Sequence, residues 1–182
     1  DMSFMFCNCN EFNQNLQDWN IENVKYLEST FEKAYKFNKP LNKWNTVNVI
    51  CMTSMFDSAE EFNQDLNNWN TKNVVFMDRL FFAAISFNGK VNTWNVYHVK
   101  SMHYMFAYAQ NFNQQINDWN VTNVKFMNNM FYAAEEFNKP LNKWNVGNVV
   151  DMSHMFCKAE EFNQNINDWD VSNVLDTSAM FS

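Results

Sequence analysis

The sequence predicts an α/β solenoid, a chain wound into stacked coils with a parallel sheet on one face and short helices on the other. Three observations predict it: a strict repeat of 25 residues, helix-like apolar spacing in the first part of each repeat, and strand-like alternation in the second part. Only two glycines and two prolines occur in 182 residues. Asparagine therefore supplies the turns, because it tolerates left-handed backbone and hydrogen-bonds to its own neighbours.

Aromatic residues mark the repeat most clearly. A Phe-Asn pair recurs from Phe12-Asn13 to Phe162-Asn163, and the 12 methionines occupy two further phases that begin at Met2 and Met5. All seven tryptophans share one phase: Trp19, Trp44, Trp69, Trp94, Trp119, Trp144 and Trp169. Residues 1–182 are thus expected to form a single solenoid of seven repeats plus the start of an eighth. Because both ends stop in mid-repeat, we expect the sequence to be part of a longer chain, or else a subunit whose ends are covered by other subunits.

The first part of each repeat predicts a short helix. In one repeat Met102, Met105, Phe106 and Ala109 follow the i, i+3, i+4, i+7 spacing that places apolar side chains on one helical face. An asparagine precedes this segment in most repeats and is expected to cap the free amides of the helix. These candidate caps are Asn23, Asn48, Asn73, Asn123, Asn148 and Asn173.

The second part of each repeat predicts a short strand. Around Trp119 the sequence Asp118-Trp119-Asn120-Val121 alternates polar and apolar residues, so Trp119 and Val121 are expected to point inward. One repeat buries too little apolar surface to offset the entropy of ordering its chain. We therefore expect the repeats to stack and their strands to pair in a parallel sheet.

Two segments carry a resemblance to a known family. MFCKAEEFNQNINDWDVSNV at 155–174 and MFDSAEEFNQDLNNWNTKNV at 55–74 resemble the BspA-like leucine-rich repeat surface proteins, whose mycoplasma-type lipoprotein repeat reads MFxxAxxFNQxLxxWxVxNV. The resemblance recurs in every repeat and implies a right-handed, leucine-rich-repeat-like solenoid at the cell surface or secreted, with a role in adhesion or host interaction. Similar repeats occur in eukaryotic microbes and large DNA viruses, so a virus particle or another assembly is the alternative location. Thr71, Leu27, Thr30 and Gly89-Lys90 depart from the family pattern.

Two rows of asparagine run through the repeats. The row that follows the Phe, from Asn13 to Asn163, is predicted to be a buried structural ladder that satisfies turn amides. The row that follows the Trp is predicted to project from the outer face of the sheet. That face is either a solvated, mutually bonded surface or a binding surface for a ligand or glycan. Its members are Asn20, Asn45, Asn70, Asn95, Asn120, Asn145 and Asp170.

Aromatic residues outside the repeat pattern gather in repeats 4 to 6. They are Phe76, Phe82, Tyr104, Tyr108, Phe126 and Tyr132. They form either a patch for a partner or packing between neighbouring helices. Alternating charge before the tryptophans places Asp18 beside Lys43, and Lys143 between Asp118 and Asp168, which we interpret as control of strand register.

Composition and spacing argue against several functions. A net charge of -7 and a single arginine, Arg79, disfavour nucleic acid. No apolar run is long enough for a membrane span, so this segment is not expected to insert into a membrane. Cys7, Cys9, Cys51 and Cys157 lack the spacing of metal ligands. Residues that break the repeat, chiefly His98, His103 and His154, do not suggest a catalytic constellation. We expect no enzyme activity, metal or cofactor.

These observations predict a non-catalytic, surface-exposed repeat module that binds protein or glycan, as in adhesion or host interaction. The alternative is a structural assembly protein of a particle or filament, which associates with itself through its repeats. The uniform asparagine row favours the first hypothesis, and the unevenly placed aromatic residues favour the second.

Overall fold

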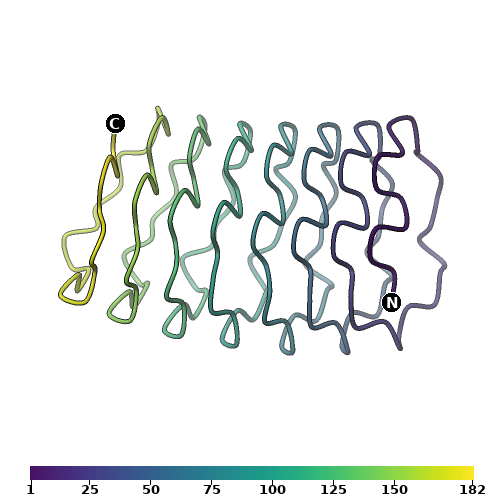
Figure 1. Ribbon diagram of the computed structural model, residues 1–182, viewed down its shortest axis with the longest axis horizontal. Coiled ribbons are helices and arrows are strands. Elements are labelled where there is room, and N and C mark those ends of the chain that lie inside the picture. The colour runs from purple at the N-terminus through teal and green to yellow at the C-terminus, as the bar shows by residue number, and fades with distance from the viewer.

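A computed structural model describes residues 1–182 as a regular stack of coils. Successive coils follow one another along the longest axis of the molecule, and the two termini lie at opposite ends (Figure 1). Each coil corresponds to one sequence repeat, so coil 1 is residues 1–25, coil 2 is 26–50, and coil 7 is 151–175, with 176–182 beginning coil 8. Positions within a coil are numbered from 1 to 25 below.

The predicted α/β architecture, with its short helices and parallel sheet, is wrong. No segment forms a helix, and β-pairing is limited to isolated parallel bridges between neighbouring coils. These bridges join position 1 of coils 2 to 8: Tyr26, Cys51, Phe76, Ser101, Phe126, Asp151 and Asp176. Turns make up the corners, at positions 3–8, 10–11, 17–18 and 22–23 of each full coil. No helix suited to spanning a membrane is present.

Main-chain hydrogen bonds explain why the apolar segment at positions 2–9 is not helical. In coil 5 the N–H groups of Met102, Tyr104 and Phe106 donate to carbonyls of coil 6, at 2.9 to 3.2 Å. Of the two N–H groups between them, that of Met105 bonds three residues back to the Met102 carbonyl, and that of His103 donates to Asp78 Oδ1 of coil 4 at 3.0 Å. Tyr104 and Tyr108 have φ of 55° and 60°, as type II turns require at their third residue. In a helix each N–H beyond the first turn bonds four residues back within the segment, whereas here every second N–H bonds to the next coil.

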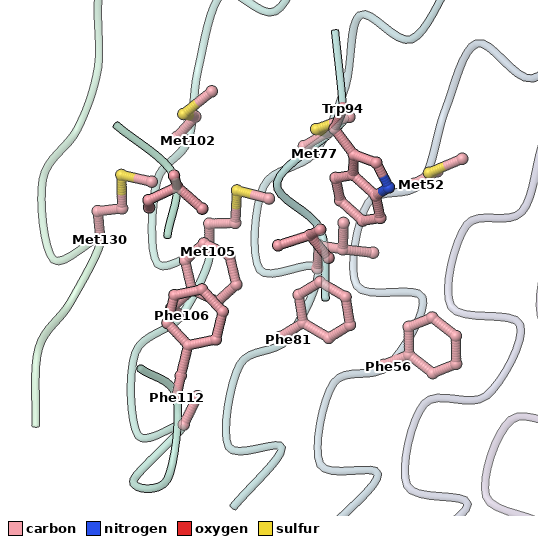
Figure 2. Close-up of a cluster of buried hydrophobic side chains, with 14 of the residues drawn as sticks. Met52, Phe56, Met77, Phe81, Trp94, Met102, Met105, Phe106, Phe112 and Met130 are labelled. Carbon is pink, nitrogen blue, oxygen red and sulfur yellow. The ribbon is translucent and has the colours of Figure 1, made fainter. Parts of the chain in front are cut away.

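The apolar spacing nevertheless identified the buried side chains. Met102, Met105, Phe106 and Ala109 are each fully buried, as the helical pattern predicted. Figure 2 shows the equivalent Met and Phe side chains of successive coils lying side by side in the interior. The error concerned the backbone path, not which residues face the core.

Three aromatic stacks run along the interior. Ring centroids at position 6, from Phe6 to Phe181, lie 5.5 to 5.7 Å apart between neighbouring coils. Those at position 12, from Phe12 to Phe162, lie 5.8 to 6.0 Å apart. At position 19, Trp44 to Trp119 stack at 6.2 to 6.3 Å. Each buried indole N–H also donates to a carbonyl of the preceding coil, as from Trp94 to Leu66 at 3.0 Å.

The segment predicted as a strand is a turn-linked edge of the coil. Trp119 and Val121 are buried while Asp118 and Asn120 are exposed, so the predicted alternation is confirmed. The main chain here bonds locally, with the Trp119 N–H donating to the Ile116 carbonyl. It makes no ladder with the neighbouring coils, and the outer surface at Asn120 is therefore not the face of a sheet.

Candidate binding faces

The asparagine row at position 13 joins the coils. The main-chain N–H of each Asn donates to Oδ1 of the Asn in the preceding coil, at 2.9 to 3.1 Å, from the Asn38–Asn13 pair to the Asn163–Asn138 pair. The predicted structural ladder is therefore present. Its predicted burial is wrong, because Asn63, Asn88 and Asn163 are exposed and the other members are half-buried.

Glutamine side chains add a second bond to this ladder in odd coils. Gln64, Gln114 and Gln164 donate through Nε2 to Oδ1 of the preceding position-13 asparagine, at 2.7 to 2.8 Å. Even coils carry Lys or Gly at this position, so the bond joins an odd coil to the even coil before it. The Phe-Asn-Gln sequence of alternate repeats thus has a structural explanation.

The asparagine row at position 20 bonds within its own coil. Oδ1 of each member accepts the main-chain N–H two residues on, at 3.0 to 3.3 Å, as an Asx turn. All members are exposed, and the Nδ2 groups of the six asparagines donate to no other group of the chain. At Asp170 the Ser172 hydroxyl and, to a smaller extent, the Ser172 N–H donate hydrogen bonds that lower the pKa of the carboxyl. These exposed, fixed groups form a candidate face, called the asparagine face below.

The prediction that six asparagines cap helices is wrong because no helix follows them, and all of them except Asn23 join coils instead. Nδ2 of Asn48 donates to the Glu22 carbonyl of the preceding coil at 2.7 Å. Asn73, Asn123, Asn148 and Asn173 make the equivalent bond.

Two equivalent hollows open on the asparagine face, four coils apart. The first, of 310 Å³, lies between coils 1 and 2 beside Asn20 and Asn45. The second, of 220 Å³, lies between coils 5 and 6 beside Asn120 and Asn145. Each is bordered by an exposed ion pair between coils, the predicted Lys43–Asp18 pair at 2.9 Å and the Lys143–Asp118 pair at 2.7 Å. Each hollow therefore offers amide, carboxylate and ammonium groups above a tryptophan.

The six candidate aromatic residues do not form one patch. Phe76 and Phe126 occupy position 1, two coils apart, and are 50% and 43% exposed. The other four come together at positions 4, 7 and 8. Phe82 lies 5.7 Å from Tyr104 and 5.4 Å from Tyr108, and Tyr108 lies 5.2 Å from Tyr132, measured between ring centroids.

Charged and polar residues complete this aromatic cluster. The Arg79 guanidinium lies 3.9 Å from the Phe82 ring centroid and is paired with Asp57 at 2.8 Å. Lys158 lies 5.6 Å from the Tyr132 ring centroid. Burial, with Tyr132 nearby, raises the pKa of Tyr108. A hollow of 300 Å³ is lined by Tyr104, Tyr108, Asn129, Tyr132 and His154.

The sequence analysis missed the part that Arg79, His154 and Lys158 take in this cluster. The sequence singles out Arg79 only as the one arginine and His154 only as a break in the repeat. The available signal was positional: all three occupy positions 4 or 8, where the side chain projects from a residue with positive φ. His103 contacts Tyr104 at 4.3 Å, whereas His98 lies beside Tyr97.

A comparison of the sequence with known protein families gives two overlapping matches. Residues 1–114 and 76–182 both match the family described as "Mycoplasma protein of unknown function, DUF285". The chain belongs to the DUF285 family. The two matches overlap at residues 76–114 and together span residues 1–182, which fits a family whose pattern recurs along the chain. The DUF285 relationship thus establishes a repeat protein without assigning it an activity. No curated protein sequence matches the chain.

Proposed function

We propose that this chain is a non-catalytic, surface-exposed repeat module that binds protein or glycan through its asparagine face. The observation that carries the proposal is the row of exposed side-chain amides at position 20, whose Nδ2 groups have no partner within the chain. Sugar hydroxyls and peptide carbonyls are acceptors suited to such donors.

The Asx turns make this row a favourable binding surface. Each amide is already held by its own main chain, so little side-chain entropy is lost when it bonds to a ligand. The spacing of the donors follows the coils, which favours a ligand that is itself repetitive, because several weak contacts then act together. The hollows near Asn20 and Asn120 add ion pairs and a tryptophan edge at two equivalent sites.

The sequence resemblance supports the same proposal. The repeats resemble those of BspA-like surface proteins, whose role in adhesion or host interaction fits an exposed and repetitive face. On this proposal the chain acts at the cell surface or after secretion. The strictness of the repeat supports a non-catalytic role, since catalysis needs single residues that converge on one point.

The test removes the amide donors without removing the turns. Asn70→Asp with Asn120→Asp keeps an oxygen acceptor for each Asx turn, as Asp170 already does, but deletes the Nδ2 donor. The variant and the unchanged chain are applied to an array of neutral glycans, acidic glycans and extracellular-matrix proteins. We expect the unchanged chain to bind at least one class of probe, and the variant to bind it at least ten-fold more weakly with the same melting temperature.

A matched control separates the asparagine face from net charge. Asn15→Asp with Asn165→Asp makes the same charge change at exposed asparagines that also form Asx turns, but at position 15. This control should bind like the unchanged chain. The proposal fails if no probe binds, or if the position-20 variant binds as well as the control.

A further inference from the structure

The face built by positions 1, 3, 4, 7 and 8, called the turn face below, differs from coil to coil more than any other surface. In coils 4 to 7 it carries the aromatic cluster and its charged neighbours, and along position 1 it carries exposed aromatic rings in alternate coils. Tyr26, Phe76 and Phe126 are 45%, 50% and 43% exposed. An apolar surface of this kind is typical of a contact with another protein.

We propose that the turn face pairs with the turn face of a second copy of this chain, in antiparallel orientation, about a two-fold axis between coils 4 and 5. Such an axis places coil 4 against coil 5 of the second copy, coil 3 against coil 6, and coil 2 against coil 7, with each position facing its own equivalent. The partner is a second copy because the turn face is complementary to the same face turned end to end.

Side-chain size is the first element of this complementarity. At position 1, Phe76 faces Ser101 and Phe126 faces Cys51, so that a large ring meets a small residue each time. The same holds for two of the three aromatic residues at positions 7 and 8, which meet alanines of the other copy, while the third, Tyr132, meets Asp57. The pairs with alanine are Phe82 with Ala107, and Tyr108 with Ala83.

The size pattern also selects the alignment of the two copies. Large and small residues alternate at position 1 every two coils, so this row alone would fit several alignments of one copy along the other. Phe82 and Tyr108 occur once each, however, and they meet small residues at their own positions when the axis lies between coils 4 and 5. A parallel two-fold would instead set each coil against the same coil and reverse the order of positions across it, so that Phe82 and Tyr108 would not meet the alanines at their own positions.

Charge favours the same orientation. At these positions coils 2 to 4 carry four carboxylates, Glu28, Glu32, Asp57 and Asp78, against two cations, Lys33 and Arg79. Coils 5 to 7 carry one carboxylate, Asp151, one lysine, Lys158, and two histidines, His103 and His154. Reversal sets the acidic half against the half with the histidines, with Asp78 facing His103, and brings Arg79 onto the Tyr104 ring. The like-charged pair Lys33 and Lys158 falls at the rim, where solvent screens it.

This proposal is independent of the proposed function, because it uses different positions of the coil. The asparagine face occupies position 20 and stays exposed in the pair. Pairing would present two asparagine faces on one particle and so increase binding to a repetitive ligand.

The first experiment measures mass. Light scattering of the chain over a concentration series is expected to give twice the 21.7 kDa chain mass, with dissociation on dilution. Phe76→Ser with Phe82→Ser should raise the dimer dissociation constant at least ten-fold. The Asn70→Asp, Asn120→Asp chain should leave it unchanged. A monomer at every concentration, or a dimer insensitive to the phenylalanine changes, overturns the proposal.

The second experiment tests orientation by cross-linking. Phe126→Cys, made in a chain with Cys7→Ser and Cys9→Ser, places a thiol opposite Cys51 of the second copy, and mild oxidation should give a covalent dimer. Adding Cys51→Ser should abolish it, because residue 126 of one copy lies three coils from residue 126 of the other. A covalent dimer that persists without Cys51 overturns the antiparallel arrangement.

Discussion

The two halves of each coil are joined to their neighbours by different parts of the chain. At positions 1–12 the main chain makes the contacts, as in coil 5, where the Met102, Tyr104, Phe106 and Tyr108 N–H groups donate to carbonyls of coil 6. At positions 13–24 side chains make most of them. The Trp94 indole bonds to the Leu66 carbonyl, and the position-13 asparagines bond across each junction from coil 1 to coil 7. The position-23 asparagines bond across every one of these junctions except that of coils 3 and 4, where His98 takes the place of Asn. The Leu66 N–H, bonded to the Lys90 carbonyl, is the main-chain exception.

This difference explains where the sequence varies. A main-chain bond can be made by almost any residue, so positions 4, 7 and 8 accept Arg, Phe, Tyr, Ala, Lys or His. A side-chain bond needs a particular donor or acceptor at a particular reach, so Trp and Asn recur without change at positions 19 and 13. The varied half is therefore free to carry a partner surface, and the uniform half holds the stack together.

The largest effect is expected at an interior tryptophan. Trp94→Phe removes the indole donor, leaves the Leu66 carbonyl without that partner, and leaves a void beside the stack, at a cost of about 3 kcal/mol in the free energy of unfolding. Trp19→Phe is the control, because Trp19 is 44% exposed and its indole makes no such bond; it should cost less than about 0.5 kcal/mol. Urea unfolding monitored by circular dichroism measures both. Equal losses would mean that the side-chain bond contributes little.

An intermediate effect is expected where the two asparagine rows are compared directly. Asn63→Ala removes the acceptor that bonds the Asn88 N–H of the next coil, and should cost about 1 to 1.5 kcal/mol. Asn70→Ala removes only the local Asx turn to Lys72, and should cost about 0.5 kcal/mol. Both side chains are exposed, so burial does not confound the comparison. Equal melting temperatures for the two variants would show that a hydrogen bond between coils and one within a coil contribute equally to stability.

The repeat length and the inward-facing residues could be predicted from sequence, because both follow from the spacing of apolar residues. Met102, Met105, Phe106 and Ala109 are buried whether the segment is a helix or a run of turns. What decides between them is the destination of the N–H groups, and apolar spacing carries no information on that. Positive φ usually draws Gly or Asn, yet here Tyr104, Tyr108 and Arg79 adopt it, so the usual turn signal was absent.

The position-20 asparagines were placed correctly from the sequence, whereas the aromatic residues were not, because only the first prediction is independent of the backbone path. The position-20 asparagines are exposed, as expected, because alternation around a buried Trp fixes their direction. The aromatic residues were predicted as one possible patch, but Phe76 and Phe126 belong to a row separate from the cluster of Phe82 and Tyr104. Helical spacing placed them on or beside one surface. The run of turns spreads them instead along the turn face, as a row at position 1 and a cluster at positions 4, 7 and 8.

The smallest effect on the free energy of unfolding is expected at positions 1–12, where the main chain joins the coils. There the substitution should stabilise the chain, whereas the preceding ones destabilise it. Ala83 has φ of 51°, where a Cβ atom is strained by roughly 1 to 2 kcal/mol, and its N–H bond to the Ala107 carbonyl does not depend on the side chain. Ala83→Gly should therefore stabilise the chain by about 0.5 to 1 kcal/mol, after the added entropy of glycine in the unfolded state is deducted. Ala84→Gly is the neighbouring control: Ala84 is fully buried and has no positive φ, so its loss should destabilise by about 1 kcal/mol or more. Opposite shifts of the urea midpoint at these adjacent alanines would show that positions 4 and 8 are constrained by backbone conformation and not by side-chain contacts. If Ala83→Gly also destabilises, the Ala83 side chain contributes packing that outweighs its strain, and this half of the coil is less free to vary than its hydrogen bonds indicate.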